Sequence, residues 1–115
     1  MQSMQSHSHY LGELEHLLLL AILKCDGNAY TVPIRAVLAE QGRRRLSRGA
    51  LFTSLDRLEA KGLVRSRMGD PVAVRGGRAR RYFEVTGAGF KALRSARAAL
   101  ATLSEGLDAV LESKA

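Results

Sequence analysis

The sequence predicts a small, mainly helical domain with a single two-stranded β hairpin. Apolar residues recur at helical spacing in four stretches, and short strand-like runs replace that spacing at residues 63–67 and 81–85. A Gly- and Arg-rich segment separates the two strands. The length of 115 residues suits one compact domain. The single cysteine excludes an intrachain disulfide and a zinc site built mainly from thiolates.

The first predicted helix follows a polar N-terminal segment, residues 1–10, which we expect to be flexible. From Leu11 to Cys25 apolar residues follow i, i+3, i+4, i+7 spacing, and further leucines cover the other side. A helix that is apolar nearly all round must be covered on two sides. We therefore expect one side to pack in its own domain and the other, including Leu14 and Leu18, to contact a second chain.

Two more helices are predicted before the first strand. One runs over residues 31–41, with Thr31 as its cap and Gly42 as its stop. After three consecutive arginines, Ser47 can cap a third helix that ends near Gly62. One stripe of the third helix is apolar and carries Leu51, Leu55 and Leu58. Its opposite face carries Gly49, Thr53, Asp56, Arg57 and Ala60.

The last helix is predicted to start after Thr86 as its cap and to run to Ser113. Its apolar residues alternate by three and four, which is typical of a coiled-coil seam over about three heptads. A helix of about 27 residues is about 40 Å long, more than so small a domain can cover. We expect self-association through it, the alternative being burial of the whole stripe within one chain. The seam residues are Leu93, Ala96, Leu100, Leu103, Leu107 and Val110.

The positive charge is concentrated in the middle of the chain. The net charge is +7, and between Arg43 and Arg81 lie 12 basic residues against 3 acidic ones. All but one of these 12 are Arg, whose planar fork suits phosphate groups and base edges. This block predicts a polyanionic partner, of which nucleic acid is the commonest, while a solvated surface is the alternative.

The order of three helices, strand, basic loop, strand and helix is that of a winged helix-turn-helix. In that fold the third helix presents a polar face to the major groove of DNA. We expect Thr53 and Arg57, one turn apart on that face, to contact base edges. Arg48 lies at the amide end of the helix, which attracts phosphate.

The segment between the strands, residues 68–80, is too long for a tight turn and is expected to project as a mobile wing loop. Its candidates for contact with phosphate or the minor groove are Arg75, Arg78 and Arg80. Arg81 is instead a candidate brace for the sheet. The three arginines at 43–45 either contact phosphate or are solvated.

Other classes of function find little support in the sequence. Of the three histidines, His7, His9 and His16, the first two lie in the flexible start with no carboxylate or thiol at ligand spacing, so we expect no metal site. Neither a phosphate-binding glycine loop nor a nucleophile with a base can be placed, so we expect no enzyme and no cofactor. Cys25 is expected to be a small core residue rather than a redox switch. The longest apolar run is far shorter than the ~20 residues of a membrane span. Without a secretory signal at the start, a cytoplasmic protein is expected.

Two motifs also carry a family resemblance. Residues 47–64, SRGALFTSLDRLEAKGLV, resemble the recognition-helix signature of PadR-like transcriptional regulators. Residues 76–89, GGRARRYFEVTGAG, resemble the family's wing and strand, ending in the Thr-x-x-Gly that opens the last helix. The resemblance covers about residues 11–95. It implies a dimeric bacterial DNA-binding regulator, usually a repressor, relieved by a small ligand in some members.

The chain departs from the family pattern in two respects. Phe52 stands where the family usually has Tyr, which removes a hydroxyl that could bind phosphate. With one long final helix the chain resembles the short branch, yet it lacks the tryptophan that multidrug-sensing members of that branch use at the dimer centre.

We therefore expect a flexible segment (1–10), a winged helix-turn-helix DNA-binding domain (11–86) and a C-terminal dimerisation helix (87–115). The expected function is sequence-specific repression by a homodimer on a pseudo-palindromic stretch of double-stranded DNA. A small-molecule effector would bind between the first and last helices of the dimer. The alternatives are a basic coiled-coil adaptor, binding an acidic protein or RNA, and a non-specific nucleic-acid-coating protein.

Overall fold

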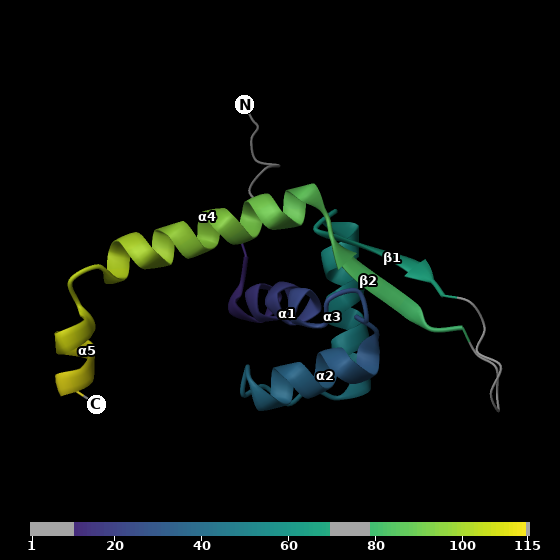
Figure 1. Cartoon of the computed structure of the whole chain (residues 1–115), viewed down its shortest axis with the longest axis horizontal. Coiled ribbons are helices and arrows are strands. Elements are labelled where there is room, and N and C mark those ends of the chain that lie inside the picture. Colours follow the sequence, from purple (N-terminus) through teal and green to yellow (C-terminus); the bar gives the residue numbers. More distant parts are fainter. Residues whose placement is uncertain (1–10, 70–78, 115) are drawn as a thin grey trace.

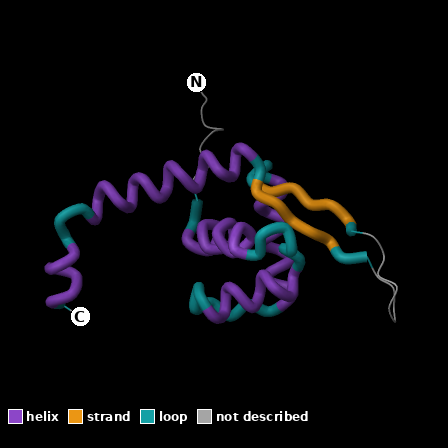
Figure 2. Tube along the Cα trace, in the orientation of Figure 1, coloured by secondary structure: helices purple, strands orange, loops and turns teal. Residues whose placement is uncertain are grey.

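The computed structural model describes residues 11–69 and 79–114. Its elements follow the order helix, helix, helix, strand, strand, helix, helix (Figures 1 and 2). They are α1 (Glu13–Lys24), α2 (Thr31–Glu40), α3 (Arg48–Ala60), β1 (Val64–Met68), β2 (Arg81–Val85), α4 (Gly87–Ser104) and α5 (Asp108–Ser113). The prediction of a mainly helical chain with one two-stranded hairpin is confirmed.

Helices α1, α2 and α3 pack together below the first half of α4, and the hairpin projects away from them (Figure 1). Helix α1 contacts α2, α3, β2 and α4, so most of its circumference is covered by its own chain. Leu18 and Leu19 are consecutive on α1 and point in different directions, yet both are fully buried. The expectation that Leu18 faces a partner chain is wrong for this reason, and the same holds for Leu93 of α4, which is 4% exposed.

Local hydrogen bonds explain where the helices begin and end. The Ser47 hydroxyl accepts from the amide of Ala50, and the Thr86 hydroxyl accepts from the amide of Gly89, which confirms both predicted caps. Helix α3 ends before Gly62, whose φ of +78° is the left-handed conformation that glycine adopts easily. Helix α2 differs from expectation: Tyr30, not Thr31, is its N-cap, and no side chain caps it.

The hairpin is antiparallel and pairs Val64 with Val85 through to Met68 with Arg81. Strand β1 begins one residue later than predicted, because Leu63 is still part of the helix end and donates its amide hydrogen to the Leu58 carbonyl. Val64, Phe83 and Val85 are buried in the core. The amide of Phe83 also donates to the carbonyl of Ala29, which ties β2 to the α1–α2 connection.

The single last helix that we expected is instead two helices. Helix α4 ends at Ser104, the backbone turns at Gly106 with φ +80°, and α5 starts at Asp108. Every described residue from 97 onward is exposed, so no packing against the body holds the chain straight at this point. A glycine in the left-handed conformation then ends the helix. The predicted continuous seam is thus wrong beyond Ser104, and Leu107 and Val110 lie outside α4.

Candidate nucleic-acid interface

Helix α3 has one buried and one open face, as predicted. Leu51, Leu55 and Leu58 are completely buried, whereas Thr53 and Arg57 are exposed on the other side. Arg48 is exposed as the first residue of the helix. Within the described part of the chain, neither Arg48 nor Arg57 forms an ion pair. The Thr53 hydroxyl and the Arg57 guanidinium are therefore available to an external partner on this face, and the Arg48 guanidinium is available at the start of the helix.

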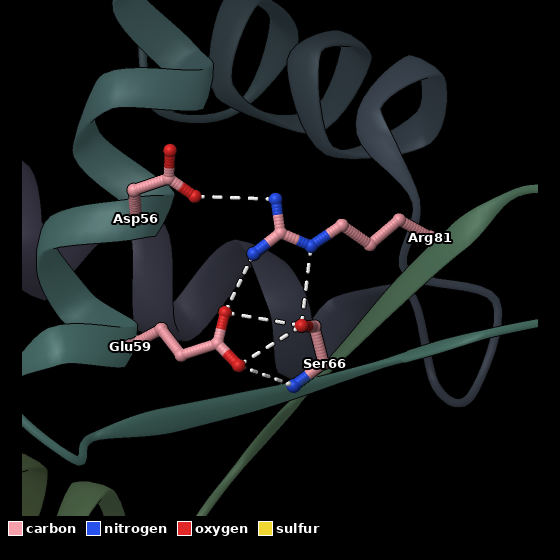
Figure 3. A network of polar contacts seen from close by, with 4 residues as sticks. All are labelled: Asp56, Glu59, Ser66 and Arg81. Atoms are coloured by element: carbon pink, nitrogen blue, oxygen red, sulfur yellow. Dashed lines mark hydrogen bonds and ion pairs between the residues drawn. The ribbon is translucent and has the colours of Figure 1, made fainter.

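A polar network fastens the hairpin to α3 (Figure 3). The Arg81 guanidinium on β2 contacts Asp56 at 3.1 Å and Glu59 at 2.6 Å, both on α3. Its Nε donates to the Ser66 hydroxyl of β1 at 3.1 Å, and that hydroxyl donates in turn to Glu59. The prediction that Arg81 braces the sheet is confirmed, and the brace extends to the helix.

Glu59 is the centre of this network. Partial burial disfavours its charged form, but hydrogen bonds from Ser66 and Arg81 outweigh that effect and hold the pKa of Glu59 below its usual value. The carboxylate therefore stays ionised under neutral conditions. With both strands and α3 linked through one charged group, the hairpin keeps a defined orientation relative to the helix.

The outward face of the hairpin carries a second cluster, which sequence reasoning missed. The Arg67 guanidinium lies 4.8 Å from the ring centre of Tyr82, and Arg80 lies 4.3 Å from that of Tyr30. The two tyrosine rings meet edge to face at 5.6 Å. Tyr82 pairs with Arg67 across the strands, a signal available once the register is known. Tyr30 could not be found this way, because it comes from the α1–α2 connection.

The other candidate cations separate into paired and unpaired groups. Arg44 forms an ion pair with Glu13 of α1, and Lys61 forms one with Glu15. Arg43 and Arg45 are exposed and pair with no acid among the described residues. Of the wing candidates, Arg80 is exposed at the start of β2, while Arg75 and Arg78 lie outside the described residues.

A largely apolar groove of about 710 Å³ is lined by residues of both α1 and α4. Its walls include Leu17 and Leu20 of α1 and Leu100 and Leu103 of α4. His16 also lines it: its Nε2 is buried without a hydrogen-bond partner, and burial, aided by the charge of Arg97, lowers its pKa.

The predicted dimerisation residues lie in different surroundings. Leu14 is half-buried on α1, packed against the core. In contrast, Leu100 is 60% exposed and Leu103 is 77% exposed, and Leu107, Val110 and Leu111 are also open to solvent. These five residues are thus exposed apolar side chains on α4, on the turn after it and on α5.

Three further features bear on other classes of function. Among the described residues, no group of three or more His, Cys, Asp or Glu side chains could hold a metal ion. Within the same ranges, no helix combines the length and apolar character that crossing a membrane requires. Cys25 packs against the core, and burial raises the pKa of its thiol. That shift disfavours the reactive thiolate.

Comparison with known proteins gives a consistent result. The family model "Transcriptional regulator PadR-like family" matches residues 19–95. A PadR-like transcription factor from Bacteroides fragilis has 28% sequence identity and a TM-score of 0.67, with 84% of this chain and 88% of that chain covered. A PadR family transcriptional regulator from Eggerthella lenta DSM 2243 has 27% identity and a TM-score of 0.58, with 81% of each chain covered.

A third structure supports the fold alone. The PadR family transcription regulator from Clostridium difficile R20291 has 22% identity and a TM-score of 0.65, with 84% of this chain and 96% of that chain covered. Among curated proteins, none matches this sequence.

Proposed function

Because the chain belongs to the transcriptional regulator PadR-like family, we propose that it is a sequence-specific repressor that binds DNA as a homodimer. One observation carries the proposal: the open face of α3 presents Thr53 and Arg57, with Arg48 exposed at the start of the helix, beside an arginine-rich hairpin that the Arg81 network holds in place. A helix with such a face can enter the major groove, where side chains of this kind contact base edges. No catalytic step and no cofactor form part of the proposal.

We assign separate DNA-contacting roles to the exposed polar and charged side chains. Residues 11–86 form the reading domain, in which Thr53 and Arg57 contact bases and Arg48 contacts phosphate near the start of α3. The wing arginines 75, 78 and 80 bind beside the groove that α3 occupies. Chromosomal DNA as the partner requires the protein to act in the cytoplasm. We assign α4 and α5, within residues 87–115, to dimerisation.

Homodimerisation is supported by the apolar surface on the final helices. Isolated exposed apolar residues are ordinary, but five of them between Leu100 and Leu111, on an arm that leaves the body, favour an interface. Two copies joined this way would place two α3 helices on half-sites one helical turn apart, about 34–36 Å, or a multiple of that distance. A palindromic operator would match the twofold symmetry of the dimer.

We place the effector, a small molecule with a largely apolar body, in the α1–α4 groove. The groove has the volume of a small-molecule site, and the unpartnered Nε2 of His16 offers one polar contact there. A ligand in this groove would change the angle between the reading domain and the dimerising arm. Operator affinity would change with the separation of the two DNA-binding domains of the dimer.

The first test is a duplex-binding measurement at several salt concentrations. DNA from upstream of the protein's own gene is compared with a scramble of the same composition. We expect a preference of roughly 10³-fold or more for one site, as for specific regulators. Equal affinity for both, with a steep salt dependence, calls for a selection from random duplexes. If that selection enriches no sequence, the protein is a non-specific binder. No binding to any duplex favours the adaptor.

The dimer is tested by replacing Leu103, which is 77% exposed, with Asp. A buried, unpaired carboxylate is costly at an interface, so we expect mostly monomer by light scattering at concentrations where the wild type is dimeric. The matched control is Val32→Asp on α2, because Val32 is 66% exposed and lies away from the arm. If both variants remain dimeric, the interface is not on α4.

A further inference from the structure

Four side chains on and beside the outer side of the hairpin follow one another in the order Arg67, Tyr82, Tyr30, Arg80, with the two rings between the two arginines. We call them the Arg–Tyr stack. The guanidinium carbon of Arg67 lies 4.8 Å from the ring centre of Tyr82. The ring centres of Tyr82 and Tyr30 are 5.6 Å apart, and the guanidinium carbon of Arg80 lies 4.3 Å from the ring centre of Tyr30. The members come from β1, β2, the N-cap of α2 and the residue before β2. The stack therefore joins both strands to the helical body on the face that the Arg81 network does not use.

The charges of these arginines are not neutralised within the described chain. Of the four described arginines on and beside the two strands, Arg65 pairs with Glu84, and Arg81 pairs with Asp56 and Glu59. Arg67 and Arg80 pair with no acid among the described residues and are held by aromatic rings instead. The hairpin thus separates cations that stabilise the fold from two whose charge is left for another molecule.

Stacking leaves the donor groups of an arginine free. A guanidinium lying over a ring uses its flat face, while its N–H groups point outward in the plane of the group. The ring also restricts the long side chain, so less conformational entropy is lost when an anion binds. Such a group suits the phosphate oxygens, which it can contact through two parallel hydrogen bonds.

The backbone around the stack is also constrained. The amide of Gly69 donates to the carbonyl of Arg80 at 2.7 Å, which closes the two strand ends beside the stack. A Cβ at Gly69 would lie 2.7 Å from the ring of Tyr82, so the chain passes directly against that ring. Arg80 is therefore positioned by its own backbone as well as by Tyr30.

We propose that the Arg–Tyr stack is a phosphate-binding site for the DNA backbone, in which Tyr82 orients Arg67 and Tyr30 orients Arg80. This inference rests on the proposed function and extends it. Of these four residues, only Arg80 stands among the expected DNA contacts. The site supplies affinity without sequence preference, because phosphates carry no base information. It lies outside the α3 face that contacts the bases.

The test measures how duplex affinity depends on salt for Arg67→Gln and Arg80→Gln. Each phosphate that a protein cation neutralises releases counterions from the DNA, and this contributes about 0.9 to the steepness with which log affinity falls as log salt concentration rises. We expect each variant to lower the slope by about twice that amount, because each homodimer carries two copies of the arginine, and to do so equally on operator and scrambled DNA. The matched control is Arg65→Gln, which removes the same charge from the same hairpin but at an arginine already paired with Glu84. Its slope should stay near the wild-type value.

The role of the rings is tested separately, with thermal melting as a check on folding. Tyr82→Leu keeps both positive charges but removes the flat face, and we expect a several-fold loss of affinity for either duplex. Tyr82→Phe keeps the face and should bind as the wild type does. If Tyr82→Leu does not fold, the two arginine variants still decide the question, because both arginines are exposed.

The outcomes separate the two levels of the proposal. In one outcome the wild type binds duplexes, but Arg67→Gln and Arg80→Gln have the same salt slope as Arg65→Gln. That outcome overturns the phosphate site alone. A loss of affinity confined to the operator also overturns it, because that result indicates contact with bases. Wild-type protein that binds no duplex overturns the proposed function and this site with it.

Discussion

Arg57→Ala is expected to lower operator affinity by roughly 10- to 100-fold while leaving affinity for scrambled DNA nearly unchanged. A bidentate contact from Arg to a base edge is worth about 1–3 kcal/mol of discrimination. Arg57 suits that contact because it is exposed on α3 and forms no ion pair with another described residue. Both affinities are measured by titration of labelled duplexes at one fixed salt concentration, since salt alone changes them strongly.

The control for this prediction is Arg94→Ala. Arg94 is exposed on α4, and its removal lowers the net charge by the same amount without touching α3. We expect it to change both affinities slightly and equally. An equal loss on operator and scrambled DNA for Arg57→Ala would identify Arg57 as a phosphate contact, and base recognition would then have to come from other residues of the helix.

Gly89→Ala is expected to produce the largest loss of folding stability of any change considered. A Cβ at position 89 would lie 2.2 Å from the carbonyl oxygen of Leu63 and 2.7 Å from a methyl carbon of Val85. The first of these atoms is backbone and cannot turn away, so α4 would have to move away from Leu63, the residue before β1. Overpacking of this kind costs about 1–3 kcal/mol and occasionally more, and we expect the upper end.

The matched control is Gly87→Ala, two residues earlier in the same helix. Among the described residues, and apart from the neighbouring backbone of α4 itself, no atom lies within 4 Å of a Cβ built at Gly87. Alanine also favours the helix, so this variant should be as stable as the wild type or more so. Urea denaturation at one protein concentration measures both, because a dimer's stability depends on concentration. A Gly89→Ala midpoint equal to that of Gly87→Ala would show that the close approach of α4 to β1 is wrong.

The last helix shows where sequence patterns were insufficient. Heptad spacing from Leu93 to Val110 predicted one helix, but Gly106 ends the helical conformation three residues after Leu103. The glycine was visible in the sequence as a helix-ending signal. Apolar spacing alone concealed it, because a short second helix can continue a three-and-four pattern after a turn.

The sequence by itself determined the element order as far as α4, the buried stripe and open face of α3, the Ser47 and Thr86 caps and the arginine-rich centre. Each depends on local spacing or on a residue within three positions, and such information is carried by the chain directly. The family followed from two motifs that lie in adjacent elements.

Only the tertiary structure decided which cations are available to a partner. Arg44 looks equivalent to Arg43 and Arg45 in the sequence, yet it contacts an acid on another element. Arg81 was expected to brace the sheet, but its acidic partners on α3 were not. The partners of Arg81 are 22 and 25 residues away, and Tyr30 meets Tyr82 across half the chain. Ion pairs and stacks between distant segments depend on how elements pack, and no local pattern records that packing.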